Sequence, residues 1–303
     1  MRAALSLSAA LLLALTSGAS ATFPGRNGGL AFSAYELREK STDALIDHEY
    51  LGFAPLRGRA GHLFGLDAVA PAVSPSGRRI AYADTRRGGI WLTQPGCRWP
   101  RDRRRPMPCS RLRRLTGFRD DRSPAWSPDS KRVAFVRGTG IHTVATAGGD
   151  RRFLMRGGEP DWSAKGDIAF RRGGIRVRTA GGGIRILTKG GDEPSWSPSG
   201  DRIAFAGDER LPDGVGLYVM NADGSELRKL WSPKEEYGYP LSPTWSPDGR
   251  VIAFLEGGSP FAGPIRAVTP RGQALAPIKL RLSGCRRCSR DINYSALSWQ
   301  PLP

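Results

Sequence analysis

The stretch SPAWSPDSKRVAFV, residues 123–136, decides the fold. An apolar segment, a Ser-Pro-Asp-Ser turn and a second apolar segment predict two short antiparallel strands joined by a tight turn. The same pattern recurs at residues 71–82, 160–170, 194–205 and 243–254. Repetition every few tens of residues is typical of a solenoid, a propeller or an array.

The repeats share a column of tryptophans. Each copy after the first carries Trp before its turn, and Val73 stands in that place in the copy at 71–82; the tryptophans are Trp126, Trp162, Trp196, Trp245 and Trp299. The spacing leaves room for about four strands per repeat, which is one propeller blade. Six anchors therefore predict six blades, with the tryptophans as packing wedges between them.

The two ends of the chain are expected to share one blade. Residues 295–301 supply a first strand and then the chain stops, whereas residues 28–33 supply a second strand with no first strand before it. Joining them would close the ring and leave no free sheet edge. The sequence therefore predicts an all-β, six-bladed β-propeller of four-stranded antiparallel blades.

The repeat also resembles a known family. WSPDGRVIAF at 245–254 and YVMNADG at 218–224 are similar to the TolB-type propeller repeat, the WD40-like PD40 unit. The resemblance covers nearly all of the mature chain, least clearly residues 34–70. It implies the fold and is uninformative about chemistry. TolB-like proteins carry an α/β domain before the propeller, whereas here the propeller is expected to begin at once.

The first 21 residues have the features of a secretory signal. Arg2 precedes an apolar segment that is too short to anchor the chain in a bilayer, and Ala-Ser-Ala at 19–21 fits the small-residue cleavage rule. We expect residues 22–303 to form one propeller domain, exported to the periplasm, the cell exterior or the cell wall. Since no later apolar segment is long enough, no transmembrane segment is expected, and the protein is expected to be a monomer.

Blades one and two depart most from the repeat. Residues 33–43 are polar and predict a long loop, and weak strands within 44–56 and 61–67 would complete blade one. In blade two the third and fourth strands are predicted at 89–93 and 111–116, with a long insertion between them.

Four cysteines in an exported chain suggest two disulfides. Cys97 with Cys109 and Cys285 with Cys288 are the favoured pairs, because each pair shares one local loop. A redox role for Cys285 and Cys288 stays open, although no helix pattern follows them. No metal or cofactor is expected, because the histidines are scattered and the sequence has no cofactor-binding motif.

The formal net charge of +18 comes mainly from arginine. One interpretation is an Arg-rich surface that keeps the protein soluble. The other is a docking site for an anionic partner in the blade-two insertion, where a disulfide would pre-order the basic loop. The residues of this basic loop are Arg98, Trp99, Arg101, Arg103, Arg104 and Arg105. Outside the cytoplasm the partner would be a protein or an anionic envelope polymer, and no nucleic acid is expected.

Carboxylates precede several of the first strands. Asp121, Glu159, Asp192 and Glu193 lie in segments that would line one mouth of the central channel. They could hold a cation or a basic peptide. The favoured interpretation is that they are solvated turn residues or that they accept backbone N–H groups, because blades two and six lack a matching carboxylate.

The sequence carries no Gly-x-Ser-x-Gly, His-Glu-x-x-His or Gly-x-x-x-x-Gly-Lys motif. The favoured hypothesis is a non-enzymatic binding or scaffold propeller of the bacterial cell envelope. The alternative is a hydrolase or lyase that uses carboxylates and histidine at the channel mouth. His48, His62 and His142 are spread over blades one and three, so no catalytic cluster can be argued from sequence.

Overall fold

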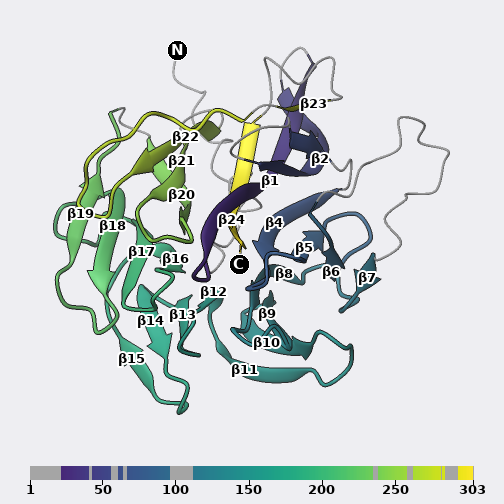
Figure 1. Cartoon of the computed structure of the whole chain (residues 1–303), viewed down its shortest axis with the longest axis horizontal. Coiled ribbons are helices and arrows are strands. Elements are labelled where there is room, and N and C mark those ends of the chain that lie inside the picture. Colours follow the sequence, from purple (N-terminus) through teal and green to yellow (C-terminus); the bar gives the residue numbers. More distant parts are fainter. Residues whose placement is uncertain are drawn as a thin grey trace, which may run out of the picture.

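The chain closes into a ring of antiparallel sheets (Figure 1). The computed structural model describes residues 22–40, 43–55, 61–63, 67–95, 112–234, 238–257, 262–280, 282–283 and 293–302. Six sheets surround a central axis, and the first strand of each sheet lies innermost (Figure 1). The six-bladed all-β propeller predicted from the repeats is confirmed.

Blades two to five each have four strands in simple order. Blade two consists of β4 (Ala68–Val73), β5 (Ile80–Asp84), β6 (Ile90–Thr93) and β7 (Arg113–Arg114). Blade three consists of β8 (Arg122–Trp126), β9 (Arg132–Arg137), β10 (Gly140–Ala145) and β11 (Arg152–Arg156). Blade four consists of β12 (Gly158–Trp162), β13 (Ile168–Arg171), β14 (Ile175–Arg178) and β15 (Ile184–Ile186). Blade five consists of β16 (Asp192–Trp196), β17 (Arg202–Gly207), β18 (Gly216–Asn221) and β19 (Arg228–Trp231).

Blades one and six differ from four strands. Blade one has five, in the order β23 (Leu282–Ser283), β3 (Gly61–Leu63), β2 (Asp43–Pro55), β1 (Arg26–Lys40) and β24 (Asn293–Leu302). Blade six has three in the part of the chain that the structure describes, namely β20 (Tyr239–Trp245), β21 (Ile252–Gly257) and β22 (Ala262–Val268). Isolated bridges from Ile265 to Ile278 and from Val268 to Ala274 stand where its fourth strand would be.

The two termini close the ring as predicted. β24 is the innermost strand of blade one and β1 is the next strand, so that Arg26 pairs with Leu302 and Leu30 pairs with Trp299. Leu30, Trp299 and their neighbour Phe32 are buried. The contact between the first and last strands therefore joins the ring through both backbone pairing and apolar packing.

The loop predicted at residues 33–43 is wrong. β1 continues through this segment to Lys40 and pairs with β2, which begins at Asp43, with a register shift between Glu36 and Leu37. Hydrogen bonding between two strands needs only backbone N–H and C=O groups, so a polar segment can form a hairpin without an apolar pattern. The two strands predicted within 44–56 and 61–67 are confirmed as β2 and β3.

Tryptophans join the neighbouring blades, as expected, at three positions. Trp126, Trp196 and Trp245 are buried, and each indole N–H donates to a backbone C=O of the preceding blade. Trp162 departs from this pattern because it is half-buried and donates to Gly166 O of its own turn. The turn after Trp162 has one residue fewer than the turns after its counterparts, which brings that carbonyl within reach.

Candidate functional site at the channel mouth

The inner strands share a β-bulge at the position before proline. Ala70, Ser123, Glu159, Glu193 and Ser242 all have φ between 48° and 51°, and the pairing register shifts at this point in each strand. Such a φ is uncommon for a residue with a side chain. Because a bulge takes one residue out of the ladder, it leaves a backbone N–H that needs another acceptor.

Two glutamates at the bulge position supply that acceptor to the next blade. The backbone N–H of Glu193 donates to Oε2 of Glu159 at 3.1 Å, and the N–H of Ser242 donates to Oε2 of Glu193 at 2.6 Å. Both glutamate side chains are buried. They therefore act as connectors between blades four, five and six, and not as solvated turn residues.

Arg171 compensates part of this negative charge. Its Nε lies 3.3 Å from Oε2 of Glu159 and 3.0 Å from Oδ1 of Asp192. Asp192 is more exposed than the glutamates. The structure therefore brings three of the four predicted mouth carboxylates, Glu159, Asp192 and Glu193, together at the junction of blades four and five.

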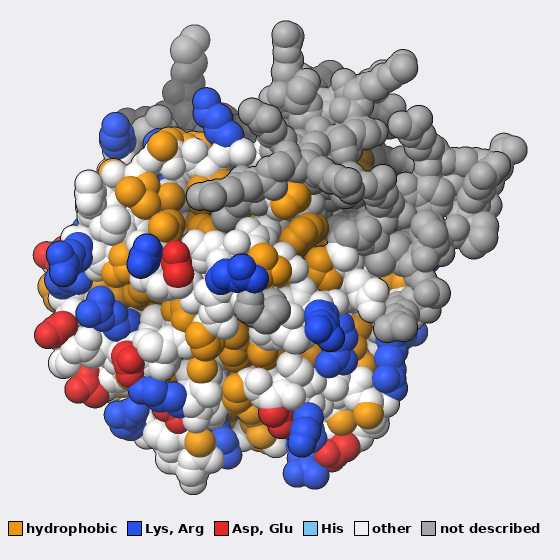
Figure 2. Space-filling view, viewed as in Figure 1, with side chains coloured by type: hydrophobic (Ala, Val, Ile, Leu, Met, Phe, Trp, Pro, Cys, Tyr) orange, Lys and Arg blue, Asp and Glu red, His pale blue; other side chains and the backbone are white. Residues whose placement is uncertain are grey.

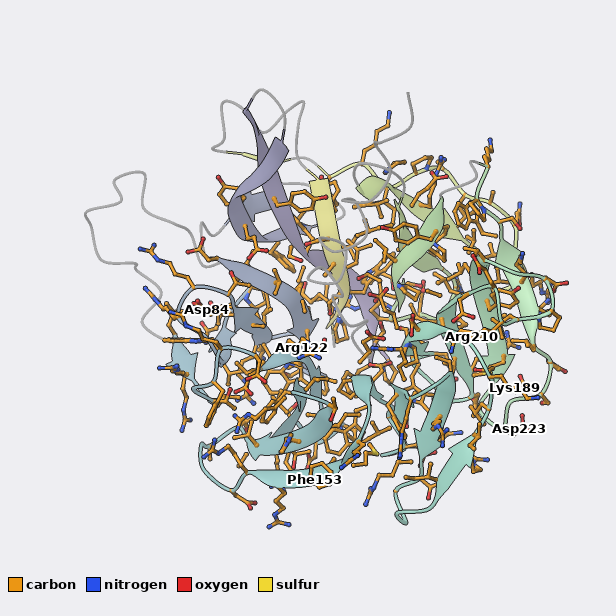
Figure 3. The ribbon with its side chains drawn as sticks, turned by 180° about the vertical axis from the view of Figure 1, so that it is seen from behind. Asp84, Arg122, Phe153, Lys189, Arg210 and Asp223 are labelled. Carbon is orange, nitrogen blue, oxygen red and sulfur yellow. The ribbon has the colours of Figure 1, made fainter. Side chains whose placement is uncertain are left out.

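The fourth predicted carboxylate, Asp121, belongs to blade three and is paired. Arg137 donates from Nε to Oδ1 at 2.6 Å and from Nη2 to Oδ2 at 2.8 Å. The Arg137 guanidinium also lies 3.9 Å from the centroid of the exposed Phe118 ring, and its pKa is raised by the hydrogen bonds to Asp121. Arg122, from the same blade, lies near the centre of the ring in Figure 3.

A further buried carboxylate, Asp161, was not singled out from the sequence. Its Oδ2 accepts the backbone N–H of Trp196 at 2.6 Å, while Oδ1 has no hydrogen-bond partner. The signal was present, because the residue before the anchor is Ala, Ser or Thr in the other copies. An acid in a column of small residues identifies a position where a side chain reaches across to the next blade.

Burial raises the pKa of these carboxyls. The pKa of Asp161 is raised well above its usual range by desolvation, against the opposing effect of its backbone hydrogen bonds. Desolvation also raises the pKa of Glu159 and of Glu193, and the charge of Glu159 adds to the effect at Glu193. Oε1 of Glu193 has no partner, which leaves its ionised form poorly compensated.

Glu193→Gln should make stability less dependent on pH. Because the folded-state pKa of Glu193 is raised above the ordinary 4.5, the native protein holds a proton that the unfolded chain releases, so the wild-type protein loses stability as pH rises above this value. Gln keeps an acceptor for the Ser242 N–H and cannot ionise. We expect equal urea midpoints near pH 4 and a higher midpoint for the variant at pH 8. A difference that does not change with pH would contradict this account.

The segment that follows the expected signal lies against the ring. Thr22 Oγ1 lies 3.2 Å from Thr244 Oγ1 of blade six, and the buried Phe23 belongs to the hydrophobic cluster that contains Ala72 of blade two and Trp126 of blade three. These two residues are therefore part of the packed propeller. This contact was not predicted, since the sequence of 22–23 carries no repeat.

The predicted basic loop lies outside the described residues, and so do Cys97, Cys109, Cys285 and Cys288. The arginines that follow the loop are described. Arg113 donates to the carbonyls of Thr146 and Ala147 in blade three, and Arg114 donates to those of Thr116 and Gly117. These two guanidinium groups hold the end of the insertion against backbone carbonyls.

His142 is the histidine whose side chain the structure describes, and it packs against aromatic rings. His142 lies between the rings of Phe135 and Phe153, with centroids 5.7 Å and 5.3 Å away, and burial lowers its pKa. Within the described ranges, no group of three or more His, Cys, Asp or Glu residues is arranged to hold a metal ion. Those ranges also contain no helix that is long and apolar enough to cross a membrane.

The mouth carboxylates correct the sequence interpretation in part. The expectation that they are solvated is wrong for Asp121, Glu159 and Glu193, which are buried. The expectation that they accept backbone N–H groups holds for the two glutamates, although those N–H groups belong to the next blade. It also holds for Asp121, whose Oδ2 accepts the Phe118 N–H at 3.4 Å. Blades two and six have the same bulge, with Ala70 and Ser242 at the position of the glutamates. Their lack of a carboxylate is therefore no evidence that Glu159 and Glu193 lack a structural role.

Known structures match the chain across most of its length. No family model and no curated protein matches the sequence. TolB from Acinetobacter baumannii is similar, with a TM-score of 0.67 and 19% identity over 92% of this chain and 68% of TolB. The chain has the TolB propeller fold. A protein assigned as TolB from Agrobacterium tumefaciens matches with a TM-score of 0.56 and 16% identity over 83% of this chain and 89% of its own.

A third similar structure is that of a protein not described as TolB. Hydrazine synthase from Kuenenia stuttgartiensis has a TM-score of 0.57 and 14% identity over 92% of this chain and 47% of its own. Identities this low show the fold alone, because the TolB-like propeller architecture supports unrelated functions. The function has to be argued from the residues of this chain.

Proposed function

We propose that this protein is an exported, non-enzymatic binding or scaffold propeller of the bacterial cell envelope that holds a protein or an anionic polymer. The observation that carries the proposal is the use of buried carboxylates as connectors between blades. Glu159, Asp161 and Glu193 are buried and accept backbone N–H groups from the next blade. Groups committed in this way are not available to bind and turn over a substrate.

The surface supports an anionic partner. Lys and Arg number 46 against 28 Asp and Glu, and on the face shown in Figure 2 the basic side chains are spread over several blades. Arginine pairs well with carboxylate and phosphate groups.

A pull-down of the mature protein from envelope extract tests the proposal. We expect the wild-type protein to retain a partner at low salt and to release it at high salt, because salt screens exposed charges. A variant with Arg101, Arg103, Arg104 and Arg105 changed to Ser should retain less of it. Arg202→Ser with Arg250→Ser is the control, because both residues are exposed and lie on other blades. Absence of any salt-sensitive partner would contradict the proposal.

The alternative is a hydrolase or lyase at the channel mouth, and one observation favours it. Raised carboxyl pKa values are typical of general acids, and Glu159, Asp161 and Glu193 have them. A turnover screen on envelope saccharides distinguishes the two functions. Activity that Glu193→Gln abolishes would establish the enzyme and overturn the binding proposal.

A further inference from the structure

The outer strand of blade four is an open edge, so the expectation that ring closure leaves no free sheet edge is wrong for this blade within the described residues. β15 lies on the rim of the ring, beyond β14 (Figure 1). All three of its residues are exposed, and Ile184 and Ile186 expose 47% and 62% of their surface. Among the outer strands whose side chains the structure describes, only β7 is also exposed throughout, and both of its residues are arginines.

Along this edge, alternate residues direct their backbone N–H and C=O groups away from the sheet. The N–H of Thr179 donates to Gly183 O and the N–H of Leu187 donates to Ile175 O, while Arg185 is the partner of Val177. In an antiparallel pair the bonded positions alternate. The N–H and C=O groups of Arg185 therefore face β14, and those of Ile184 and Ile186 point away from the sheet.

Side chains divide this edge into two faces. Ile184 and Ile186 lie on one face, because successive residues of a strand alternate. Arg185 lies on the other face, and its guanidinium reaches Ala222 O of blade five at 3.4 Å. An added strand would therefore place apolar residues beside the two isoleucines and a residue of another type beside Arg185.

The charge around β15 indicates which polar residues an added strand would carry. Residues 168–191 contain six basic residues and no Asp or Glu: Arg171, Arg172, Arg176, Arg178, Arg185 and Lys189. Only Arg171 has an ion pair within the described part of the chain. Asp223 of blade five lies near Arg185, since the pKa of Asp223 is lowered by hydrogen bonds from Ser225 and, to a smaller extent, by the charge of Arg185. Lys189 lies toward the rim in Figure 3. Opposite charges on facing strands are favourable, so acidic residues fit beside Arg185.

Blade one shows that this ring accepts an added outer strand. β23 pairs in parallel with β3, with Leu282 opposite Gly61 and Ser283 opposite His62. In blade one the extra strand comes from the chain itself. Blade four offers the same kind of edge with nothing paired to it among the described residues.

We propose that β15 binds an extended segment of a partner protein as a fifth strand of blade four, and that this segment alternates apolar and acidic residues. The inference rests on the proposed binding function and names the surface and the partner. Backbone hydrogen bonds to Ile184 and Ile186 would give affinity, and the alternation would give specificity.

A synthetic peptide tests the strand. The probe is an eight-residue peptide of alternating Glu and Val with a fluorescent label, titrated with the mature protein and followed by anisotropy. Ile186→Pro removes one outward N–H without removing a bond to β14, which an edge strand tolerates. Ile186→Thr is the matched control, because it also loses apolar surface and keeps the N–H.

We expect Ile186→Pro to bind the peptide about tenfold more weakly than Ile186→Thr, which corresponds to the loss of about one hydrogen bond. Arg185→Ser should also weaken binding, and a Lys–Val peptide should not bind. Equal affinity of the Pro and Thr variants would overturn the proposal, even if Arg185→Ser weakened binding, because the surface would then recognise charge alone. If the protein retains an envelope partner in the pull-down but does not bind the peptide, strand addition at β15 is refuted and the proposed binding function still stands.

Discussion

Trp196→Ala should lower the free energy of unfolding by about 4 kcal/mol. The indole is fully buried among residues of blades four and five, and its N–H donates to Asp161 O at 3.1 Å. Truncation leaves a cavity between two blades and removes the hydrogen bond that joins them. The measurement is urea unfolding of the mature chain followed by tryptophan fluorescence and far-UV circular dichroism.

Trp162→Ala is the matched control in the same column. Trp162 is half-buried and bonds to its own turn, so its loss should cost about 1–2 kcal/mol. Equal costs for the two variants would contradict the assignment of Trp196 as a connector between blades, since both replacements remove the same atoms.

Removal of β24, Asn293–Leu302, should abolish cooperative folding. The deletion takes away the buried Leu297 and Trp299 and exposes Leu30 and Phe32 on β1. Burial of each large side chain contributes about 1.5–3 kcal/mol, so the total approaches the whole stability of a domain, about 5–15 kcal/mol. We expect loss of the near-UV circular dichroism signal and earlier elution on size exclusion, because the unfolded chain is more expanded than the folded one.

A permuted chain separates ring closure from chain order. Arg26 pairs with Leu302, so β24 placed before β1 with a short Gly-Ser linker would form a hairpin with the same contacts. The permuted chain should unfold at nearly the same urea concentration as the natural order. A deletion variant that unfolds at the wild-type midpoint would show that closure by the two termini does not hold the ring.

The repeats predicted the ring because one physical pattern recurs in register. An apolar strand, a turn of Ser, Pro and Asp or Gly, and a second apolar strand specify a blade wherever they occur. The loop predicted at 33–43 is wrong because this segment lacks such a pattern. Its strand is specified by backbone pairing with β2, which leaves no apolar alternation to detect.

The candidate site was only partly predictable. Glu159 and Glu193 could be placed near the channel by their position before the anchor, but their burial depends on a bulge that turns each side chain toward the next blade. The sequence of a single blade does not show this geometry, because the side chain's partner belongs to the next blade. The hydrogen bond of Asp161 and the burial of Phe23 in the core likewise depend on residues far apart in the chain.

Hydrogen–deuterium exchange of the mature protein, alone and with the partner that the pull-down retains, tests the central claim most directly. A binding propeller with structural mouth carboxylates predicts slower exchange in the basic loop and in β14 and β15, and unchanged exchange at Glu159 and Glu193. Protection confined to β12 and β16 around those two glutamates would contradict the account, because the partner would then occupy the channel mouth.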